Sequence, residues 1–522
     1  MSEIADDDRC TALDPTPSAF AADQTVADLG ATHFIGIGGA GMSVLAEMLH
    51  EEGITVTGSD REESDKTRRL QSLGITVYIG QRAGNVSAAH CVVYSSAITA
   101  DNPEIVAARA QGIRLVHRSD ILALLMHARR TVTIAGAHGK TTTSSMLAHM
   151  LRVAGTGALG DPSYAIGGSI QESDGSVGDG GHAGHGDVLV AEADESDGSF
   201  LKYRPDIAIV TNVEADHLDH YGTERAYREA FVRYVAHAKK RVFVCGDDEG
   251  ALAVVRAADP QVRARMVLYS THSATQLGDL QGAQLVRIMA ENESAGTGHE
   301  RFTLNIPQQV FDTEAELTVP MSLRIPGIHN ARNATAAVLA AIDLGMDSRT
   351  AADAASTFLG AVRRFQIHGT EKGVTVVDDY AHHPTEIAAL LDAARRRYPK
   401  AHLHVLFQPH LFSRTKFFAR QFAQALGKAD DVIVTGVFPA RERQEDFPDI
   451  SGATICDQAA RLVHEPARHW IENVEDMQVA AQMIALRAHH GDVVFTVGAG
   501  DITTMVPVVL HALKAHRDAC ED

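Results

Sequence analysis

The stretch TVTIAGAHGKTTT, residues 131–143, sets a β-branched run directly before a glycine-containing loop, a lysine and three threonines. An apolar run followed at once by Gly-Lys-Thr is typical of a buried strand that leads through a phosphate-binding loop into a helix. In such a loop, backbone N–H groups, the lysine and a hydroxyl hold the phosphates of ATP and its Mg²⁺. The spacing is shorter than GxxxxGK[ST], which predicts a variant P-loop. The predicted ATP-binding residues are Gly136, Ala137, His138, Gly139, Lys140, Thr141 and Thr142.

Short β-branched runs alternate with helical stretches on both sides of this loop. They lie at residues 33–37, 54–57 and 91–94, at 188–191 and 207–210, and at 374–377, 403–407, 432–434 and 493–495. The alternation predicts parallel sheets with crossover helices. At roughly 150 residues per domain, a chain of 522 residues accommodates three α/β domains in series.

The domain boundaries follow from these runs. Residues 1–30 lack apolar periodicity and are predicted to be a flexible tail. Residues 31–117 are predicted to form a Rossmann-like domain, residues 118–350 a central ATP-binding domain and residues 351–522 a C-terminal domain. Residues 171–187, QESDGSVGDGGHAGHGD, are too rich in glycine to predict packing, so we expect an exposed loop rather than a metal site at its two histidines.

A second glycine-rich turn follows the first predicted strand. Gly36 to Gly41 reads GIGGAG, a GxGxxG motif that allows backbone N–H groups to approach a pyrophosphate at a helix N-terminus. Asp60 lies 19 residues after Gly41, a spacing that suits a ribose hydroxyl. The motif predicts a nucleotide diphosphate without separating a nicotinamide cofactor from a nucleotide-sugar.

Acidic residues follow two strands of the central domain. They occur in EADESD, residues 192–197, and in NVEADHLD, residues 212–219. Mg²⁺ prefers hard oxygen donors and shares them with substrate phosphates, so these strand ends are predicted to hold the metal. His217 stands among these carboxylates and is either a metal ligand or a structural histidine.

Two polar segments follow strands of the C-terminal domain, DDYAHHP at residues 378–384 and FQPHLFSRT at residues 407–415. Ligands bind outside the carboxyl ends of parallel strands. The histidines and the arginine of these segments are therefore candidates to meet a carboxylate or a phosphate, with a purely structural role as the alternative.

Composition excludes several classes of protein. The formal charge is 47 minus 67, or −20, which argues against a nucleic-acid partner. No apolar run reaches the ~20 residues of a membrane span, and the acidic start MSEIADDDRC is unlike a signal peptide. The five cysteines form no CxxC pair and are predicted to be free thiols. We expect a cytoplasmic protein without membrane insertion.

Taken in order, nine motifs resemble the Mur ligase family of peptidoglycan synthesis, and within it the alanine-adding ligases. They are GIGGAGMS, GAHGKTTT, EADESDGSF, TNVEADHLDHY, PGIHNARNATAA, RRF, DDYAHHPTEI, FQPHLFSRT and GAGD, spread over residues 32–505. The resemblance implies an N-terminal Rossmann-like domain for a UDP-sugar, a central P-loop ATPase domain and a C-terminal Rossmann-like domain. It also implies ATP- and Mg²⁺-dependent joining of L-alanine to the lactyl carboxylate of UDP-N-acetylmuramate through an acyl-phosphate.

The resemblance carries roles to individual positions. It implies that the UDP-sugar is bound by Gly38, Gly39, Ala40, Gly41, Met42, Ser59 and Asp60. It implies that Lys140 grips the phosphates, that Thr141, Glu192 and His217 hold Mg²⁺, and that ATP is also met by His329, Asn330, Asn333, Arg364 and Asp379. Finally, it implies that the reacting carboxylate is oriented by His382, His410 and Arg414, with Tyr380 close to the alanine.

Three positions depart from the family pattern. Gln81 replaces a common histidine on the uracil side, Ala137 replaces a common threonine in the P-loop, and residues 223–238 contain no lysine. The last departure predicts a site without the modified lysine of sibling ligases. The competing functions are a ligase that recycles a whole tripeptide, a nicotinamide-dependent oxidoreductase and a non-catalytic scaffold. We expect a monomer or a weak homodimer.

Overall fold

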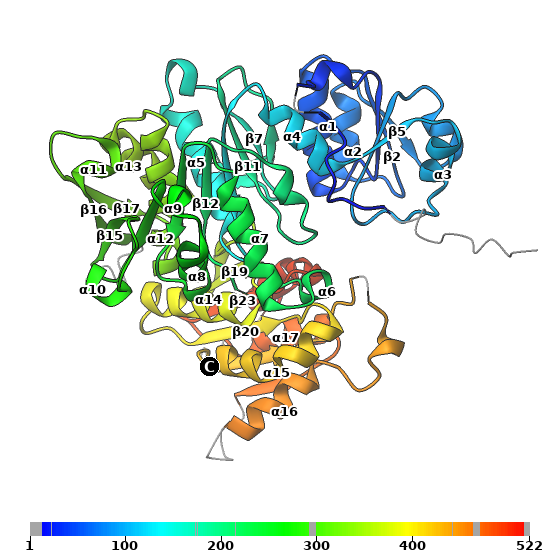
Figure 1. Cartoon of the computed structure of the whole chain (residues 1–522). Helices are drawn as coiled ribbons and strands as arrows, with labels where there is room; N and C mark the ends of the chain where they lie inside the picture. The colour runs from blue at the N-terminus through cyan, green and yellow to red at the C-terminus, as the bar shows by residue number, and fades with distance from the viewer. Residues whose placement is uncertain are drawn as a thin grey trace, which may run out of the picture. The chain divides into compact units, whose positions relative to one another are not determined.

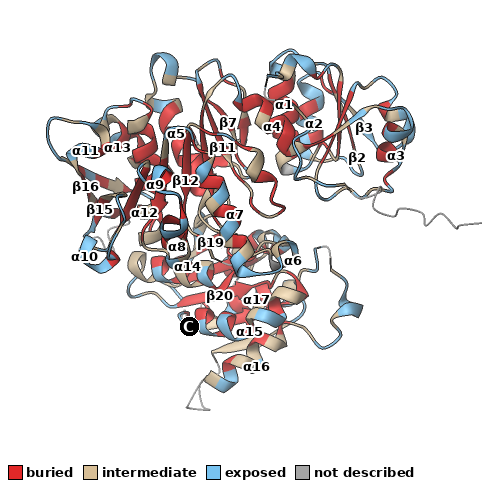
Figure 2. Ribbon diagram, in the orientation of Figure 1, coloured by how far each residue is buried: buried red, intermediate tan, exposed pale blue. Residues whose placement is uncertain are grey.

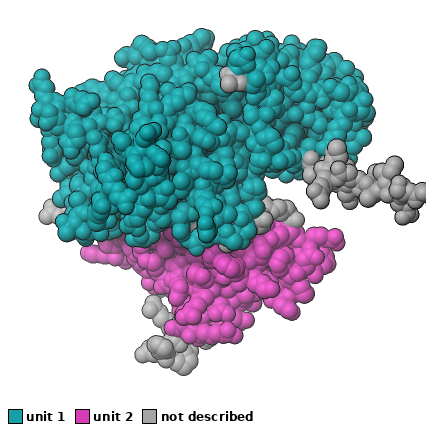
Figure 3. All heavy atoms as spheres, in the orientation of Figure 1, with its two compact units in different colours: residues 1–289, 302–321, 332–358 teal, residues 290–301, 322–331, 359–522 magenta. Residues whose placement is uncertain are grey.

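The computed structural model describes residues 13–21, 23–172, 174, 176–214, 216–291, 299–440, 442–462 and 470–515. The chain forms two compact units (Figure 3). The first comprises residues 1–289, 302–321 and 332–358, and the second comprises residues 290–301, 322–331 and 359–522. Within the described ranges, no helix is both long enough and apolar enough to cross a membrane.

The first sheet has the strand order β3-β2-β1-β4-β5, and every pair is parallel. Its strands are β1 (Thr32–Ile35), β2 (Val56–Asp60), β3 (Thr76–Ile79), β4 (Cys91–Tyr94) and β5 (Arg114–His117). Its helices are α1 (Ala40–Glu51), α2 (Asp65–Ser72), α3 (Pro103–Ala110) and α4 (Arg118–Met126), with 3-10 turns η2 (Val26–Asp28) and η3 (Ala83–Val86). The order reverses at β1 and β4, as in doubly wound nucleotide-binding folds. The predicted Rossmann-like architecture is confirmed.

Neighbouring apolar side chains of β1 lie on opposite faces of the sheet, which explains why helices cover both faces. Phe34 belongs to the apolar cluster that contains Leu70 of α2, whereas its neighbour Ile35 belongs to a second cluster with Ile105 of α3. Successive side chains of a strand point to opposite faces, so each face needs its own helices. Figure 1 shows α1 and α2 on one side of the strands and α3 on the other.

The second sheet carries the P-loop and has the order β10-β7-β11-β6-β12-β13-β14-β15-β16-β17 among the described residues. Its strands are β6 (Arg130–Ala135), β7 (Ser163–Ala165), β10 (Gly181–His182), β11 (Val188–Glu192), β12 (Ile207–Val210), β13 (Arg241–Cys245), β14 (Met266–Ser270), β15 (Gln284–Ala290), β16 (Glu300–Ile306) and β17 (Leu317–Leu323). From β7 to β15 the pairs are parallel, and β10 joins β7 antiparallel. The central strands are buried along their length (Figure 2).

Most helices of this region lie between strands of the second sheet in the chain order. They are α5 (Lys140–Ala154), α6 (Leu218–Tyr221), α7 (Glu224–Ala236), α8 (Glu249–Ala257), α9 (Pro260–Arg263), α10 (Ala274–Leu277), α11 (Gln308–Phe311), α12 (Ile328–Asp343) and α13 (Ser348–Ser356), with 3-10 turns η4 (Gly157–Leu159) and η5 (Ser199–Lys202). A separate hairpin pairs β8 (Ile170–Gln171) with β9 (Val177–Gly178).

The third sheet, β18-β19-β23-β20-β21-β22, is parallel except for its edge strand β18. Its strands are β18 (Gln366–Glu371), β19 (Val374–Asp379), β20 (Leu403–Phe407), β21 (Asp431–Val434), β22 (Ile471–Asn473) and β23 (Val493–Val497). Its helices are α14 (Pro384–Arg397), α15 (Phe412–Leu426), α16 (Ala453–Leu462), α17 (Met477–Arg487) and α18 (Val506–Ala515), with 3-10 turns η7 (Gln444–Asp446) and η8 (Asp501–Met505).

The segment expected to be a tail makes specific contacts over its described part. The amide of Ala19 donates to Asp120 Oδ1 at 3.1 Å, and Tyr94 Oη donates to the carbonyl of Asp14 at 3.3 Å. Leu29 is buried in the first apolar cluster. Single side chains and backbone groups make these contacts, which periodicity does not detect. Residues 1–12 of the predicted tail lie outside the described residues.

The prediction that residues 171–187 are too glycine-rich to pack is wrong for their second half. Gly181 and Gly184 are buried, and the amide of Ala183 donates to Glu51 Oε2 of α1 at 2.9 Å. A Cβ at Gly181 would lie 2.3 Å from Val44 Cγ1. The lack of a side chain therefore lets this backbone approach α1 closely.

Candidate active site

The predicted P-loop lies between β6 and α5 and depends on two glycines. Gly136 has φ +137° and Gly139 has φ +84°, conformations that side chains disfavour. A Cβ at Gly136 would lie 2.2 Å from Thr211 Oγ1, and one at Gly139 would lie 2.7 Å from Asn333 Oδ1. Lys140 is the first residue of α5, and Thr142 is buried two residues later. The strand, loop and helix predicted from the sequence are confirmed.

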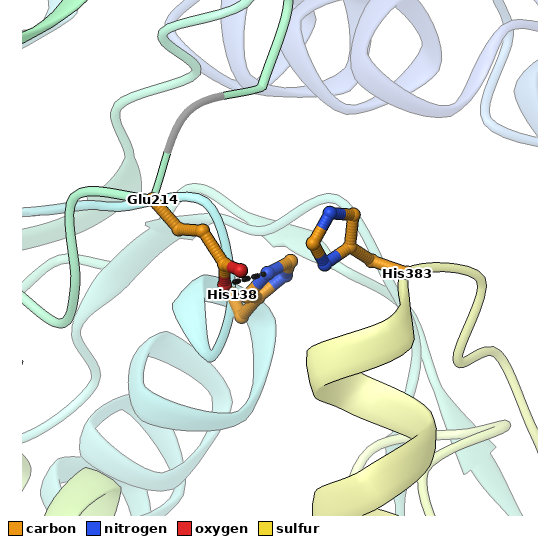
Figure 4. Close-up of side chains that lie close together, drawn as sticks. All are labelled: His138, Glu214 and His383. Carbon is orange, nitrogen blue, oxygen red and sulfur yellow. Dashed lines mark hydrogen bonds and ion pairs between the residues drawn. The ribbon is translucent and has the colours of Figure 1, made fainter. Parts of the chain in front are cut away.

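Residues at the end of β12 hold the loop in shape. Asn212 Oδ1 accepts the amide of His138 at 3.0 Å, while Thr211 Oγ1 and Asn212 Nδ2 donate to its carbonyl at 2.6 and 2.8 Å. The His138 ring Nε2 lies 3.1 Å from Glu214 Oε2 (Figure 4). The loop is therefore anchored at its middle residue by backbone and side chain.

Lys140 is engaged by a carboxylate that the motifs did not assign. Lys140 Nζ donates to Glu195 Oε1 and Oε2 at 3.0 and 2.9 Å and to the carbonyl of Gly136 at 2.5 Å. Glu195 is completely buried. Burial alone would lower the pKa of Lys140, but the charges of Glu195 and Asp194 hold that pKa above its usual value. The many carboxylates within residues 192–197 indicated a charged site, but the sequence could not show which of them faces Lys140.

Thr141 and Glu192 meet at one glycine turn. The amide of Gly167 donates to Glu192 Oε1 at 3.0 Å, and a Cβ at Gly168 would lie 2.9 Å from Thr141 Cγ2. Ser144, one turn further along α5, donates to the same carboxylate oxygen at 3.3 Å. A hydroxyl and a carboxylate this close to the P-loop fit the oxygen preference of Mg²⁺.

His217 lies on the Glu195 side of the site. Its Nε2 is 3.9 Å from Glu195 Oε1 and 3.8 Å from Asp216 Oδ2. Its backbone has φ +53°, an uncommon conformation for a non-glycine residue that often marks a functional position. An imidazole held beside carboxylates could bind a metal ion together with their oxygens.

The GxGxxG turn forms at the start of α1, with Gly39 as the helix N-cap and Ala40, Gly41 and Met42 in the first turn. The amide of Gly38 donates to Asp60 Oδ2 at 2.8 Å, and a Cβ there would lie 2.9 Å from that oxygen. Asp60 thus shapes the loop itself. The side chain of Met42 packs in the core, which leaves its backbone as the part available to a ligand.

Ser59 and Gln81 have partners of their own. Ser59 is buried, and its Oγ donates to Glu104 Oε2 at 2.6 Å, while its carbonyl accepts the amides of Gly36 and Ile37 at 2.8 and 2.9 Å. Gln81 Oε1 accepts Asn102 Nδ2 at 2.8 Å. Ser59 therefore supports the glycine turn from within the sheet.

The acidic segment after β11 also contacts the first sheet's domain. Arg118 donates to Asp194 at 2.8 Å. Ser96 Oγ donates to Asp197 Oδ2 at 2.5 Å and lies 3.1 Å from His117 Nε2. Burial lowers the pKa of His117 to about 4, so the imidazole is neutral at pH 7. These contacts, which the sequence analysis did not predict, join the acidic segment to the domain of the first sheet within the first unit.

The PGIHN segment starts α12. Asn330 Nδ2 donates to the carbonyl of Pro326 at 2.7 Å, and a Cβ at Gly327 would lie 2.6 Å from His329 Cε1. Asn333, one turn later, is the residue that lies against Gly139 of the P-loop. Of the predicted adenine-side residues, Asn333 thus contacts the loop directly.

In the second unit, Asp379 ends β19 and is buried. Its carboxylate accepts the amides of Phe365 at 2.7 Å and Ala381 at 2.8 Å. Burial raises the pKa of Asp379 to about 6. The Arg364 guanidinium lies 5.1 Å from the centre of the Tyr380 ring. Arg364 and Asp379 are therefore near one another through the Phe365 turn.

Tyr380, His382 and His410 lie together in this unit. The His382 ring centre is 5.4 Å from that of Tyr380 and 5.8 Å from that of His410. Burial lowers the pKa of His382 to about 4, and the positive charge of Arg414 acts in the same direction. Arg414 is in the first turn of α15. His383, the neighbour of His382, caps the N-terminus of α14 (Figure 4).

Three parallel-stranded domains with a glycine turn after the first strand and a P-loop after the sixth define a multidomain α/β enzyme that uses a nucleoside triphosphate. Family models match over most of the chain: "Mur ligase family, catalytic domain" at residues 31–130, "Mur ligase middle domain" at 134–341 and "Mur ligase, glutamate ligase domain" at 363–500. The chain belongs to the Mur ligase family, as its motifs predicted.

Individual proteins are similar over nearly the full length. A Bifidobacterium adolescentis protein named UDP-N-acetylmuramate--L-alanine ligase is 68% identical over 98% of both chains. The solved UDP-N-acetylmuramate-alanine ligase MurC of Thermotoga maritima is 28% identical with a TM-score of 0.71, covering 93% of this chain and 100% of its own. The murein peptide ligase mpl of Psychrobacter arcticus is 24% identical with a TM-score of 0.64, covering 94% and 100%, and shows the shared fold.

Proposed function

We propose that this chain joins L-alanine to the lactyl carboxylate of UDP-N-acetylmuramate at the expense of ATP, a step of peptidoglycan synthesis. The observation that carries this proposal is the 68% identity over 98% of both chains with the Bifidobacterium adolescentis ligase of that name. The GxGxxG turn lies within residues 31–130, which match the Mur ligase family. The motif is therefore no argument for a nicotinamide-dependent oxidoreductase. The 24% identity with a murein peptide ligase supports no tripeptide-recycling function.

The chemistry is a phosphoryl transfer followed by an acyl transfer. The lactyl carboxylate attacks the γ-phosphate of ATP and becomes an acyl-phosphate, with ADP as the leaving group. The amine of alanine then attacks the acyl carbon, loses a proton and expels phosphate. Negative charge develops in both steps, and the protein's contribution is positioning and electrostatic stabilisation rather than a covalent nucleophile.

In this proposal, the phosphates lie along residues 136–142, and Lys140 is the side-chain cation that meets them. Mg²⁺, when bound, would neutralise phosphate charge, and Thr141, Glu192 and His217 would hold it. The adenine side would be met by His329, Asn330 and Asn333 and by Arg364 and Asp379. The buried position of Asn333 against Gly139 supports the adenine assignment.

The UDP-sugar would bind with its pyrophosphate at the N-terminus of α1, over Gly38 to Met42. The start of α1 at Ala40 supports this position, because the N-terminus of a helix favours negative charge. Gln81, tied to Asn102, would shape the uracil side in place of the family's usual histidine. Ser59 and Asp60 would act by holding the turn.

The cluster in the second unit would serve the reacting end of the substrate. His382, His410 and Arg414 would orient the carboxylate or its acyl-phosphate, with Tyr380 near the alanine. Their mutual proximity supports a shared ligand. We also propose the domain limits 31–117, 118–350 and 351–522, a cytoplasmic location, and a monomer or weak homodimer without a nucleic-acid partner.

The test is phosphate release from ATP in the presence of UDP-N-acetylmuramate, scanned across the amino acids and the murein tripeptide. We expect release with L-alanine that depends on both UDP-N-acetylmuramate and Mg²⁺. Release that requires the tripeptide instead would favour the recycling ligase. A protein that releases no phosphate with any acceptor would contradict the proposal.

A further inference from the structure

All three N–H donors of the P-loop lysine are occupied. Lys140 Nζ makes two bonds to the carboxylate of Glu195, at 3.0 and 2.9 Å, and one to the carbonyl of Gly136 at 2.5 Å, with the carbonyl of Ala137 further away at 3.4 Å. An ammonium group has three donors and accepts no bonds. Lys140 therefore cannot donate to a phosphate in this arrangement without first giving up one of these bonds.

Glu195 is equally committed to the lysine. Its side chain is 0% exposed, and both of its oxygens accept a hydrogen bond from Lys140 Nζ. Removing one partner from a buried ion pair leaves an uncompensated charge, which is strongly unfavourable. When Lys140 turns to a polyphosphate, the carboxylate thus needs another cation. His217, a candidate metal ligand, lies 3.9 Å from Glu195 Oε1.

We propose that Glu195 is a positioning residue that competes with ATP for Lys140, and that Mg²⁺ relieves this competition by compensating the carboxylate beside His217. The inference rests on the proposed function, since it assumes an ATP site at the P-loop. Nucleotide without a divalent cation then meets two obstacles, a lysine already bound and a buried negative charge. Binding of nucleotide and metal is consequently linked through Glu195.

The test compares nucleotide affinity with and without the metal. Glu195→Gln keeps the shape of the side chain and removes its charge. The dissociation constant of adenylyl imidodiphosphate is measured by titration calorimetry in EDTA and in excess Mg²⁺. In EDTA we expect the variant to bind about tenfold more tightly, the low end of couplings measured for close charge pairs. In Mg²⁺ we expect the two affinities to converge.

A double-mutant cycle decides whether Glu195 acts through the lysine. In a Lys140→Met background there is no lysine for the carboxylate to hold. Adding Glu195→Gln to that background should therefore raise the affinity for the analogue in EDTA by much less than tenfold. An equal gain in both backgrounds would overturn the inference, because the carboxylate would then act on the phosphates directly. Equal affinities of wild type and Glu195→Gln in EDTA, or weaker binding by the variant, would also overturn it.

Asp197→Asn is the matched control. Asp197 belongs to the same acidic segment but bonds to Ser96 rather than to Lys140, so its variant should bind the analogue in EDTA as wild type does. If Glu195→Gln does not fold, Glu195→Asp takes its place, and its shorter side chain should give a smaller gain in EDTA. Wild type that binds the analogue under neither condition would instead remove the ATP site on which the proposed function rests.

Discussion

The side chain of Lys140 is 16% exposed and pairs with the fully buried Glu195, so its replacement should affect both chemistry and stability. We expect Lys140→Met to abolish ligation and to lower the free energy of unfolding by about 3–5 kcal/mol, the usual cost of breaking a buried pair. Burial raises the pKa of Glu195, and the variant loses the cation that opposes this shift. A carboxyl with a raised folded-state pKa takes up a proton on folding, so the variant should lose stability as the pH rises above the unfolded value of about 4.3.

Denaturant unfolding of wild type and variant at several pH values measures this effect. Lys202→Met is the matched control, because Lys202 forms a buried pair with Asp120 at 2.7 Å outside the P-loop. It should be destabilised as well, yet retain nucleotide binding. A Lys140→Met protein as stable as wild type throughout the pH range would refute the buried-pair account.

For single residues, the sequence predicted which residues lie at the candidate site better than it predicted which side chains pair with one another. The strand, loop and helix around residues 136–142 were predicted because strand ends and glycine spacing are local features, whereas the metal-binding roles of Glu192 and His217 stay predictions. The pairing of Lys140 with Glu195 was not predictable, since six carboxylates lie within residues 192–197 and 212–216 and the side-chain direction depends on tertiary packing. Ser96 and His117 were missed because they become site neighbours only when the chain folds.

Among the elements, the strand β10 depends on glycine. A Cβ at Gly181 would lie 2.3 Å from Val44 Cγ1 of α1. Gly181→Val should therefore cost about 1–3 kcal/mol of stability through overpacking. Gly84→Val is the control, because nothing lies within 4 Å of a Cβ there. Thermal unfolding of both variants measures the difference, and equal melting temperatures would mean that the strand does not dock on α1.

A histidine at the start of β20 should make this sheet's stability depend on pH. His404 is buried, with Nδ1 3.0 Å from Asp431 and Nε2 3.2 Å from Asp492. Burial alone would lower the pKa of His404, but hydrogen bonds to these carboxylates outweigh burial and raise it. A raised histidine pKa stabilises the fold fully below the unfolded value of about 6.5 and less as the pH rises through the folded value.

We therefore expect His404→Gln to lose about 1.5–3 kcal/mol near pH 6, as for hydrogen bonds to charged groups, and less near pH 9. His489→Gln, whose side chain is 85% exposed near Asp492, is the control and should show a small loss at both values. Chemical unfolding at the two pH values makes the comparison. A loss for His404→Gln that grows toward pH 9 would contradict this assignment.

For the molecule as a whole, the sequence predicted three parallel-stranded domains and the structure confirms the architecture. Buried strands read as continuous β-branched runs, which is why β1, β6, β12 and β20 were found within a residue or two. The antiparallel β10 and edge strand β18 were not predicted, because short edge strands carry little apolar pattern. The packing of residues 13–21 and 23–30 was not predicted, because single side chains and backbone groups make its contacts.

The central claim is that the whole molecule couples ATP cleavage to the addition of a single alanine. The most direct measurement is mass spectrometry of the products formed from UDP-N-acetylmuramate, ATP and Mg²⁺ with L-alanine and murein tripeptide supplied together in equal amounts. We predict UDP-N-acetylmuramoyl-L-alanine, with one ADP and one phosphate per product. Accumulation of the tripeptide conjugate, or consumption of ATP with UDP-N-acetylmuramate unchanged, would contradict the account.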